Sequence, residues 1–170
     1  SETLGMLYGM HWPYRQYTTG RDVLCSPLHK RLVTEGACFG ELAGWERANW
    51  FADPRTKPKY EYSYGPQNWH HNQKKEHETT RERVALYDQT SFAKFDVVGP
   101  DAECILERIC ANSLGRDIGS VTYTPWLNER AGIEADVTVT RFAEHAFRVI
   151  TAPTTRRKDW HWLLNHIPTG

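Results

Sequence analysis

The stretch that decides the fold is residues 121–141, which read VTYTPWLNERAGIEADVTVTR. Residues 133–140 alternate strictly between apolar and polar side chains, which is the period of an antiparallel strand with one buried face. Residues 121–127 read as a second strand, and the loop residues 128–131 before Gly132 are typical of a hairpin connection. The stretch therefore predicts an antiparallel hairpin with one face in a core and one polar face.

The polar face of this hairpin carries the candidate site. A four-residue loop at 128–131 places Tyr123 directly opposite Asp136, with Thr138 on the same side. A loop one residue longer puts Tyr123 and Asp136 on opposite faces, because side chains alternate with period two. A tyrosine beside a carboxylate suits a flat, nitrogen-rich ligand, since the ring can stack and the carboxylate can accept N–H bonds. The alternative is the ordinary solvent-facing side of a strand.

The rest of the chain changes character near residue 75. The first part is rich in aromatic residues, Pro and Gly, and predicts one helix from Ser26 to Gly36, an extended region at 37–51 and a long connection at 52–71. The second part predicts helices at 76–86, 100–110 and 154–166 and strands at 92–98, 121–127, 133–141 and 146–151. The expected buried faces of the last two helices are Ala102, Ile105, Leu106, Ile109 and Cys110, and Trp160, Leu163, Leu164 and Ile167. This order predicts an α+β fold of antiparallel strands with flanking helices.

Composition excludes several classes of protein. Twenty-one basic and 21 acidic residues give no general attraction to nucleic acid or anionic membrane, and no apolar run approaches the ~20 residues of a membrane span. Four cysteines, at 25, 38, 104 and 110, are expected to be reduced and buried. Cys25 has no basic partner in sequence that would make it a nucleophile. No metal site is expected, because His70–His71 are adjacent and His161 and His166 are five apart.

The second part of the chain resembles the folate-binding part of the glycine-cleavage T-protein (aminomethyltransferase) family. The resemblance is carried by the helix and turn at 76–90, the strand at 95–99, the hairpin and the residues 155–160. Tyr87 stands for the family's Phe and Thr90 for its Ser. Asp136 falls on the second of two family aspartates, and Ala135 stands at the first. Thr140 stands where the family often has an aromatic residue.

The first part resembles the junction of sarcosine and dimethylglycine dehydrogenase-like flavoproteins, through residues 8–13, 19–21, 26–28 and 44–51. The resemblance implies that residues 1–60 end an FAD-dependent oxidoreductase region and that 61–170 begin a folate-binding domain. No two glycines lie two apart, so the G-x-G-x-x-G signature of a dinucleotide site is absent. We therefore expect a fragment or one part of a larger assembly, with FAD bound mainly elsewhere.

The resemblance implies a flavin- and tetrahydrofolate-dependent dehydrogenase or demethylase of a small methylated amine. Asp136 would bind the folate amine nitrogens and assist proton removal, Tyr123 would shape the site, and Thr138 would line it. The expected partners are the remaining parts of the flavoprotein or partner chains, in the bacterial cytoplasm or the mitochondrial matrix. Two alternatives stay open: a non-catalytic regulatory relative, and a folate-dependent demethylase or aminomethyltransferase without flavin.

Overall fold

The chain packs as two compact units, Ser1–Ser91 and Phe92–Gly170, in the computed structural model. The structure describes residues 1–10 and 15–168, so His11, Trp12 and Pro13 of the flavoprotein-like motif lie outside the described residues. This division describes only how the residues pack into two units. The assignment of residues 1–60 to an oxidoreductase and of 61–170 to a folate-binding domain stays a prediction.

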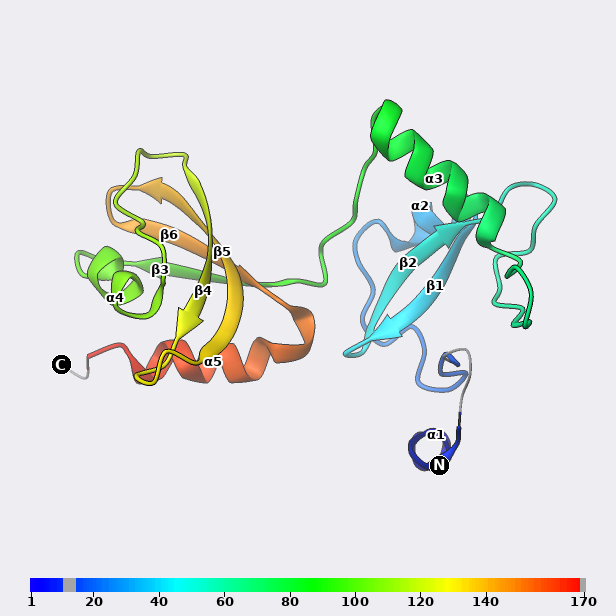
Figure 1. Cartoon of the computed structure of the whole chain (residues 1–170), viewed down its shortest axis with the longest axis horizontal. Coiled ribbons are helices and arrows are strands. Elements are labelled where there is room, and N and C mark those ends of the chain that lie inside the picture. The colour runs from blue at the N-terminus through cyan, green and yellow to red at the C-terminus, as the bar shows by residue number, and fades with distance from the viewer. Residues whose placement is uncertain (11–14, 169–170) are drawn as a thin grey trace. The chain divides into compact units, whose positions relative to one another are not determined.

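The second unit is built on a four-stranded antiparallel sheet in the order β3-β6-β5-β4 (Figure 1). The strands span Ala93–Val98 (β3), Val121–Leu127 (β4), Ile133–Ala143 (β5) and Ala146–Thr151 (β6). Every second residue of β3 and β6 is buried, as the alternating sequence requires. The predicted strands and the α+β class are confirmed.

Two helices close the core of this unit, α4 (Ala102–Ile109) and α5 (Arg156–Asn165), the latter entered through a short 3₁₀ turn, η1 (Pro153–Thr155). The core joins inward residues of all four strands to Leu106 and Ile109 of α4 and Leu163 of α5. The predicted face of α4 is confirmed, because Ala102, Leu106 and Ile109 are buried. Together these residues form a single apolar layer on one side of the sheet.

The predicted face of α5 is wrong in part. Leu163 is buried, but Trp160, Leu164 and Ile167 are exposed. The buried carboxylate of Asp159 explains the difference: it accepts hydrogen bonds from the hydroxyls of Thr151 and Thr155, at 2.6 Å for Thr155. These bonds turn the helix so that residues 159, 162 and 163 face inward, and the apolar pattern alone does not reveal that constraint.

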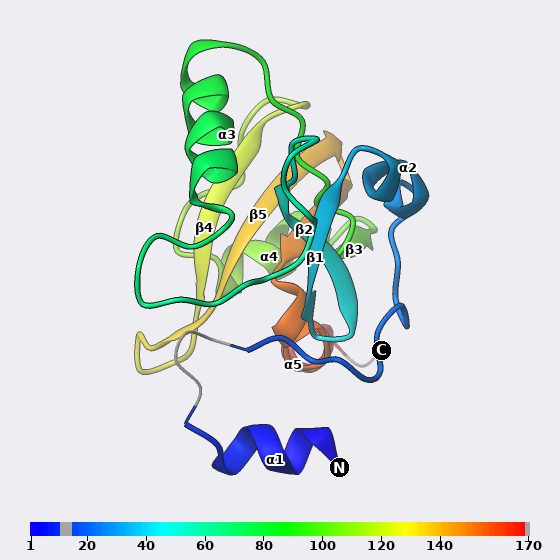
Figure 2. The same cartoon turned by 90° about the vertical axis from the view of Figure 1, so that its right-hand side faces the viewer.

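The first unit is built on a two-stranded antiparallel hairpin, β1 (Ala37–Leu42) and β2 (Trp45–Phe51). Its two connecting residues, Ala43 and Gly44, have φ of 53° and 83°, as a tight type I′ hairpin turn requires. Helix α2 (His29–Thr34) lies beside β1 (Figure 2), and α1 (Glu2–Tyr8) precedes it. The predicted helix near Ser26–Gly36 and the extended region at 37–51 are confirmed.

Helix α3 spans His70–Glu82, whereas the sequence predicted a helix at 76–86. The helix packs on β2 through polar side chains rather than an apolar stripe. Glu76 Oε1 accepts from the Phe51 amide at 2.7 Å, and the buried Asn72 accepts from the Asp53 amide at 3.2 Å. Hydrophobic periodicity therefore carries little information on where α3 begins. Among the described helices, none is long and apolar enough to cross a membrane.

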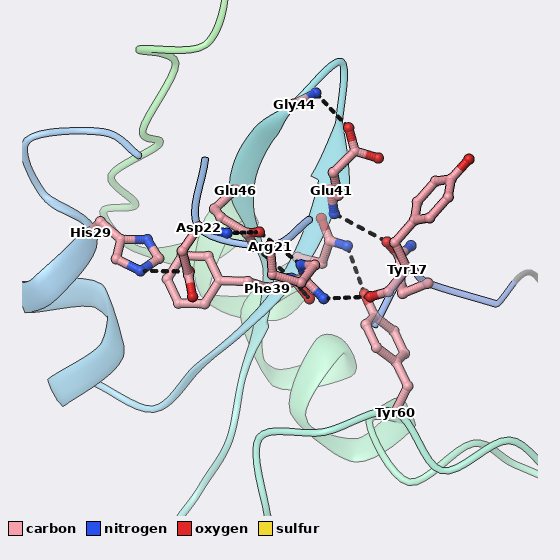
Figure 3. Close-up of polar contacts among 11 residues, drawn as sticks. Tyr17, Arg21, Asp22, His29, Phe39, Glu41, Gly44, Glu46 and Tyr60 are labelled. Carbon is pink, nitrogen blue, oxygen red and sulfur yellow. Dashed lines mark hydrogen bonds and ion pairs between the residues drawn. The ribbon is translucent and has the colours of Figure 1, made fainter. Parts of the chain in front are cut away.

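A buried ion pair fixes the segment that leads into α2 (Figure 3). Arg21 Nε donates to Glu46 Oε1 at 2.7 Å, and its other nitrogens donate to the carbonyls of Tyr17 and Phe39. The Glu46 side chain is 1% exposed. The Arg21 guanidinium therefore holds the pKa of Glu46 below its ordinary value.

Removing Arg21 should test this constraint. Arg21→Met leaves the Glu46 carboxylate buried without a charged partner, so we expect the free energy of unfolding to fall by about 3 kcal/mol at neutral pH. Because the Glu46 pKa is lowered in the folded state, its stabilising effect is present above the ordinary value of 4.5 and is lost as the pH falls through the folded-state pKa. Urea unfolding followed by circular dichroism, at neutral and at acid pH, measures both effects.

The control is Arg31→Met, an exposed position on α2. It should change the free energy of unfolding by less than about 0.5 kcal/mol. Two results would contradict a stabilising Arg21–Glu46 ion pair: an equal loss of unfolding free energy in both variants, or a loss in Arg21→Met that is just as large at acid pH.

Candidate functional site

The register of the β4–β5 hairpin differs from the prediction. Tyr123 pairs with Thr138, and Asp136 pairs with Pro125, so Tyr123 and Asp136 are diagonal neighbours rather than directly opposite. Leu127 pairs with Ile133, which makes the loop five residues long, and a bulge follows between Trp126 and Leu127. The longer loop and the bulge each shift the pairing by one residue. The two shifts together restore the face, so Tyr123 and Asp136 lie on the same side.

The loop takes this form because Asn128 closes it. Its Oδ1 accepts from the amides of Arg130 and Gly132, at 3.0 and 2.9 Å, and its Nδ2 donates to Glu134 Oε1 at 2.8 Å. Ala131 adopts a φ of 60°, a left-handed conformation that the loop needs to turn back. Asn128 therefore sets the loop length on which the site depends.

The Tyr123 and Asp136 side chains meet on the exposed face of the sheet. The Asp136 carboxylate, as a hydrogen-bond acceptor and as a negative charge near the Tyr123 hydroxyl, raises the pKa of Tyr123. Diagonal neighbours on a sheet lie far enough apart that only a long aromatic side chain spans the gap. Tyr123 is 64% exposed, and Asp136 is exposed beside it.

The strand order brings further residues to the same face. One row across the sheet joins Lys94, Ile150, Thr138 and Tyr123 in register. Thr138 and Ile150 are half-buried there. Ile150 and Lys94 were missed by sequence analysis, because their place beside Thr138 follows from β6 lying between β3 and β5. The alternation of residues 146–151 shows which side Ile150 faces, but not which strand neighbours it.

The neighbouring row across the sheet contains an ion pair between Arg148 and Asp96. Arg148 donates to both carboxylate oxygens of Asp96, at 2.7 and 3.0 Å, and lies 5.0 Å from the centre of the Phe142 ring. This pair lowers the pKa of Asp96. Asp136, by contrast, makes no ion pair within the described part of the chain. Asp136 is therefore the carboxylate of this face that is available to a ligand.

The face fits one side of a tetrahydrofolate. Its exposed carboxylate can accept N–H bonds, its exposed aromatic ring offers a stacking surface, and Thr138 adds a hydroxyl beside an aliphatic Ile150 side chain. A cavity of about 670 Å³ lies elsewhere, in the first unit between β2, α3 and residues 84–91, and none of these three polar residues lines it. The polar face is thus a single wall rather than an enclosed pocket.

The chain does not offer a comparable fit to FAD. Its glycines are at least four residues apart, so it has no glycine-rich turn to cradle a dinucleotide pyrophosphate.

The cysteines differ from the expectation in part. All four are free thiols, as predicted, but Cys25 and Cys104 are exposed. Burial raises the pKa of Cys38 and of Cys110 to about 11, which keeps both thiols protonated near neutral pH.

The geometry defines the class: a mixed helix and antiparallel-sheet domain whose helices cover one face and whose other face displays a Tyr–Asp contact. A family model described as the GCVT N-terminal domain matches residues 28–169. The chain belongs to this family, and the resemblance inferred from the sequence is confirmed. The match begins inside the segment that was assigned to the oxidoreductase region.

Curated relatives extend this family assignment. The chain is 48% identical to 4-methylaminobutanoate oxidase (formaldehyde-forming) of Paenarthrobacter nicotinovorans over 95% of its length, and 31% identical to human mitochondrial sarcosine dehydrogenase over 84%. It is 28% identical over 98% of its length to the mouse mitochondrial regulatory subunit of pyruvate dehydrogenase phosphatase. The chain spans about a fifth of each relative, 20%, 18% and 20% respectively.

A solved structure shows the same fold. The glycine cleavage system aminomethyltransferase T of Bartonella henselae superposes with a TM-score of 0.68 at 27% identity, over 85% of this chain and 36% of that protein. The relatives are thus oxidoreductases of methylated amines and an aminomethyltransferase by name, together with a regulatory subunit.

The Tyr123–Asp136 contact can be tested without a ligand. Asp136→Asn removes the negative charge that disfavours the tyrosinate, so we expect the pKa of Tyr123 to fall towards its ordinary value of 10.0. Nuclear magnetic resonance of tyrosine labelled at the ring carbon bearing the hydroxyl measures this titration. Glu144→Gln, in the turn between β5 and β6, should leave it unchanged. An unchanged Tyr123 titration in Asp136→Asn would show that the two side chains do not meet.

Proposed function

We propose that this chain supplies one wall of a tetrahydrofolate site in a protein that oxidises a small N-methyl amine. The observation that carries the proposal is the exposed Asp136 carboxylate beside the exposed Tyr123 side chain on the sheet face opposite the core. The names of the relatives support the amine: an N-methylamino acid oxidase and a sarcosine dehydrogenase both act on secondary N-methyl amines. In this proposal the one-carbon unit removed from the amine is captured beside Asp136.

The residues of the chain have separate roles. Tetrahydrofolate supplies the amine nitrogens that accept the one-carbon unit. Asp136 accepts a hydrogen bond from such a nitrogen and takes the proton that the nitrogen loses as its bond to carbon forms. Tyr123 holds the carboxylate in place through its hydroxyl and packs its ring against the flat part of the ligand. Thr138, directly opposite Tyr123, lines the same surface.

The remaining requirements of the reaction lie beyond these residues. We propose that FAD, which would supply the oxidising chemistry, is held by other parts of the flavoprotein or by a partner chain. The open wall supports this division, since a single sheet face cannot exclude water from a reacting ligand. The rest of the folate site then comes from the segments that cover this face.

Replacing Asp136 should separate oxidation from capture. In the protein at its natural full length, Asp136→Asn should lower the yield of methylene-tetrahydrofolate roughly tenfold to a hundredfold, because a charged hydrogen bond contributes about 1.5–3 kcal/mol. Amine oxidation should persist, and the missing carbon should appear as free formaldehyde. Product analysis of both one-carbon species, with sarcosine or 4-methylaminobutanoate as substrate, measures this partition.

The matched control is Glu144→Gln, which removes an exposed carboxylate at the far end of β5. It should leave the partition at the wild-type ratio. A wild-type ratio in Asp136→Asn would refute the role of this carboxylate, and a parallel loss of amine oxidation would place Asp136 in the oxidation step instead.

Tyr123 allows the ring and the hydroxyl to be distinguished. Tyr123→Phe keeps the stacking surface, whereas Tyr123→Ala removes it, so we expect Tyr123→Ala to weaken binding of 5-formyltetrahydrofolate by roughly tenfold and Tyr123→Phe by less. Isothermal titration calorimetry measures both affinities. Equal affinities in Tyr123→Ala and wild type would mean that the ligand does not contact this ring.

A regulatory role is the second candidate, and the similarity to a phosphatase regulatory subunit along almost the whole chain favours it. Such a protein would keep the packing of the sheet without turnover. A wild-type protein that binds 5-formyltetrahydrofolate but oxidises none of the methylated amines would support the regulatory role over the enzymatic one.

A further inference from the structure

Three side chains of different chemistry converge before and at the start of α2. Asp22, Cys25 and His29 each offer one ligand atom, and these atoms all lie within 4.8 Å of one another. We propose that they form a binding site for a divalent transition metal ion of the zinc class. The spacing Asp-x2-Cys-x3-His is not among the histidine pairs from which no metal site was expected.

Asp22 is held in its place by the buried ion pair. Its φ of 59° is a left-handed conformation that a residue with a Cβ adopts only when the surroundings impose it. The Asp22 amide donates to Glu46 Oε1 at 2.9 Å, the same oxygen that receives Arg21 Nε (Figure 3). The carboxylate of Asp22 is therefore directed by a backbone that Glu46 has fixed, while its side chain remains 72% exposed.

The backbone just before Cys25 is anchored as well. Leu24 forms an isolated bridge to β2: its amide donates to the Gly44 carbonyl at 3.2 Å, and its carbonyl accepts from the Glu46 amide at 2.8 Å. Cys25 follows immediately and is exposed. The site thus has a rigid backbone on the Asp22 and Cys25 side and accessible ligand atoms, which lowers the entropy lost on binding.

The His29 ring is oriented by packing rather than by hydrogen bonds. Its centre lies 4.4 Å from that of Phe39, and its side chain is 18% exposed. Nε2 faces Asp22 Oδ1 at 3.6 Å, beyond hydrogen-bond distance, and the buried Nδ1 has no partner among the described residues. Because neither nitrogen is committed to a hydrogen bond, the proton can reside on Nδ1 and leave the Nε2 lone pair facing the cluster.

The local charge favours a cation. Partial desolvation, followed by the negative charges of Asp22 and Glu46, raises the pKa of the exposed Cys25 thiol. The carboxylate of Asp22 attracts a metal ion, and the nearby cation Arg21 is neutralised by Glu46. A bound divalent metal would instead favour the deprotonated form of this thiol. The S–H bond breaks, a sulfur–metal bond forms and one proton is released to solvent.

The donor set selects the kind of metal. One thiolate, one imidazole and one carboxylate suit zinc or cobalt in a tetrahedral site, whereas calcium and magnesium require oxygen ligands. Three protein ligands leave the fourth position to water. The exposed side chains of Asp22 and Cys25 need only rotate to bring their ligand atoms to about 2.0–2.3 Å from a shared centre.

Cobalt(II) provides a direct test, because a cysteine thiolate on cobalt produces a charge-transfer band and tetrahedral coordination produces intense visible bands. The protein at its natural full length is freed of metal with a chelator and titrated with cobalt, then with zinc. We expect one equivalent of cobalt to develop both bands and zinc to bleach them. Cys25→Ser should abolish the thiolate band and weaken zinc binding on the order of 100-fold.

Cys104→Ser is the matched control, since it removes the other exposed thiol and lies outside the cluster. It should leave the cobalt spectrum unchanged. A second measurement needs no variant: zinc should protect Cys25 but not Cys104 from alkylation, as read by peptide mass spectrometry. A cobalt spectrum that survives Cys25→Ser, or alkylation of Cys25 that zinc does not slow, overturns the proposal.

Discussion

The candidate site depends on the length of the loop between β4 and β5, which the side chain of Asn128 fixes. That side chain accepts two backbone amides and donates to Glu134, which fixes a five-residue loop between β4 and β5. With that loop alone, Asp136 would face the core, where an unpaired carboxylate is costly. The bulge at the base of the hairpin adds the second shift and returns Asp136 to the open face. Loop and bulge therefore act together, and neither places the site without the other.

Much of the fold could be predicted because apolar periodicity reports burial. The alternation at 133–140 identified the exposed face of β5, and the spacing from Ala102 to Ile109 identified the buried face of α4. Prediction failed where polar groups set the geometry. Asn72 and Glu76 attach α3 to β2, and the buried Asp159 turns α5, so no hydrophobic pattern marks either arrangement. The pairing of Tyr123 with Thr138 likewise depends on a bulge that sequence periodicity does not reveal.

The two proposed sites obey a common physical rule. On the sheet, the hydroxyl of Tyr123 lies beside the exposed carboxylate of Asp136. Before α2, the buried Glu46 orients the backbone of Asp22. In both places an exposed acidic side chain has a close polar neighbour that limits the conformations open to it. Fewer conformations are then lost when a ligand binds.

The distribution of the four thiols has a practical consequence. Cys38 and Cys110 are shielded by burial, with pKa values raised to about 11, whereas Cys25 and Cys104 are exposed. One exposed thiol belongs to each compact unit, since the units divide after Ser91. These residues therefore offer one attachment point for a spin label or fluorophore in each unit, and a label on Cys25 would occupy the proposed metal site. With the metal site empty, spectroscopic distances between these two labels would report whether the units rearrange when a folate binds.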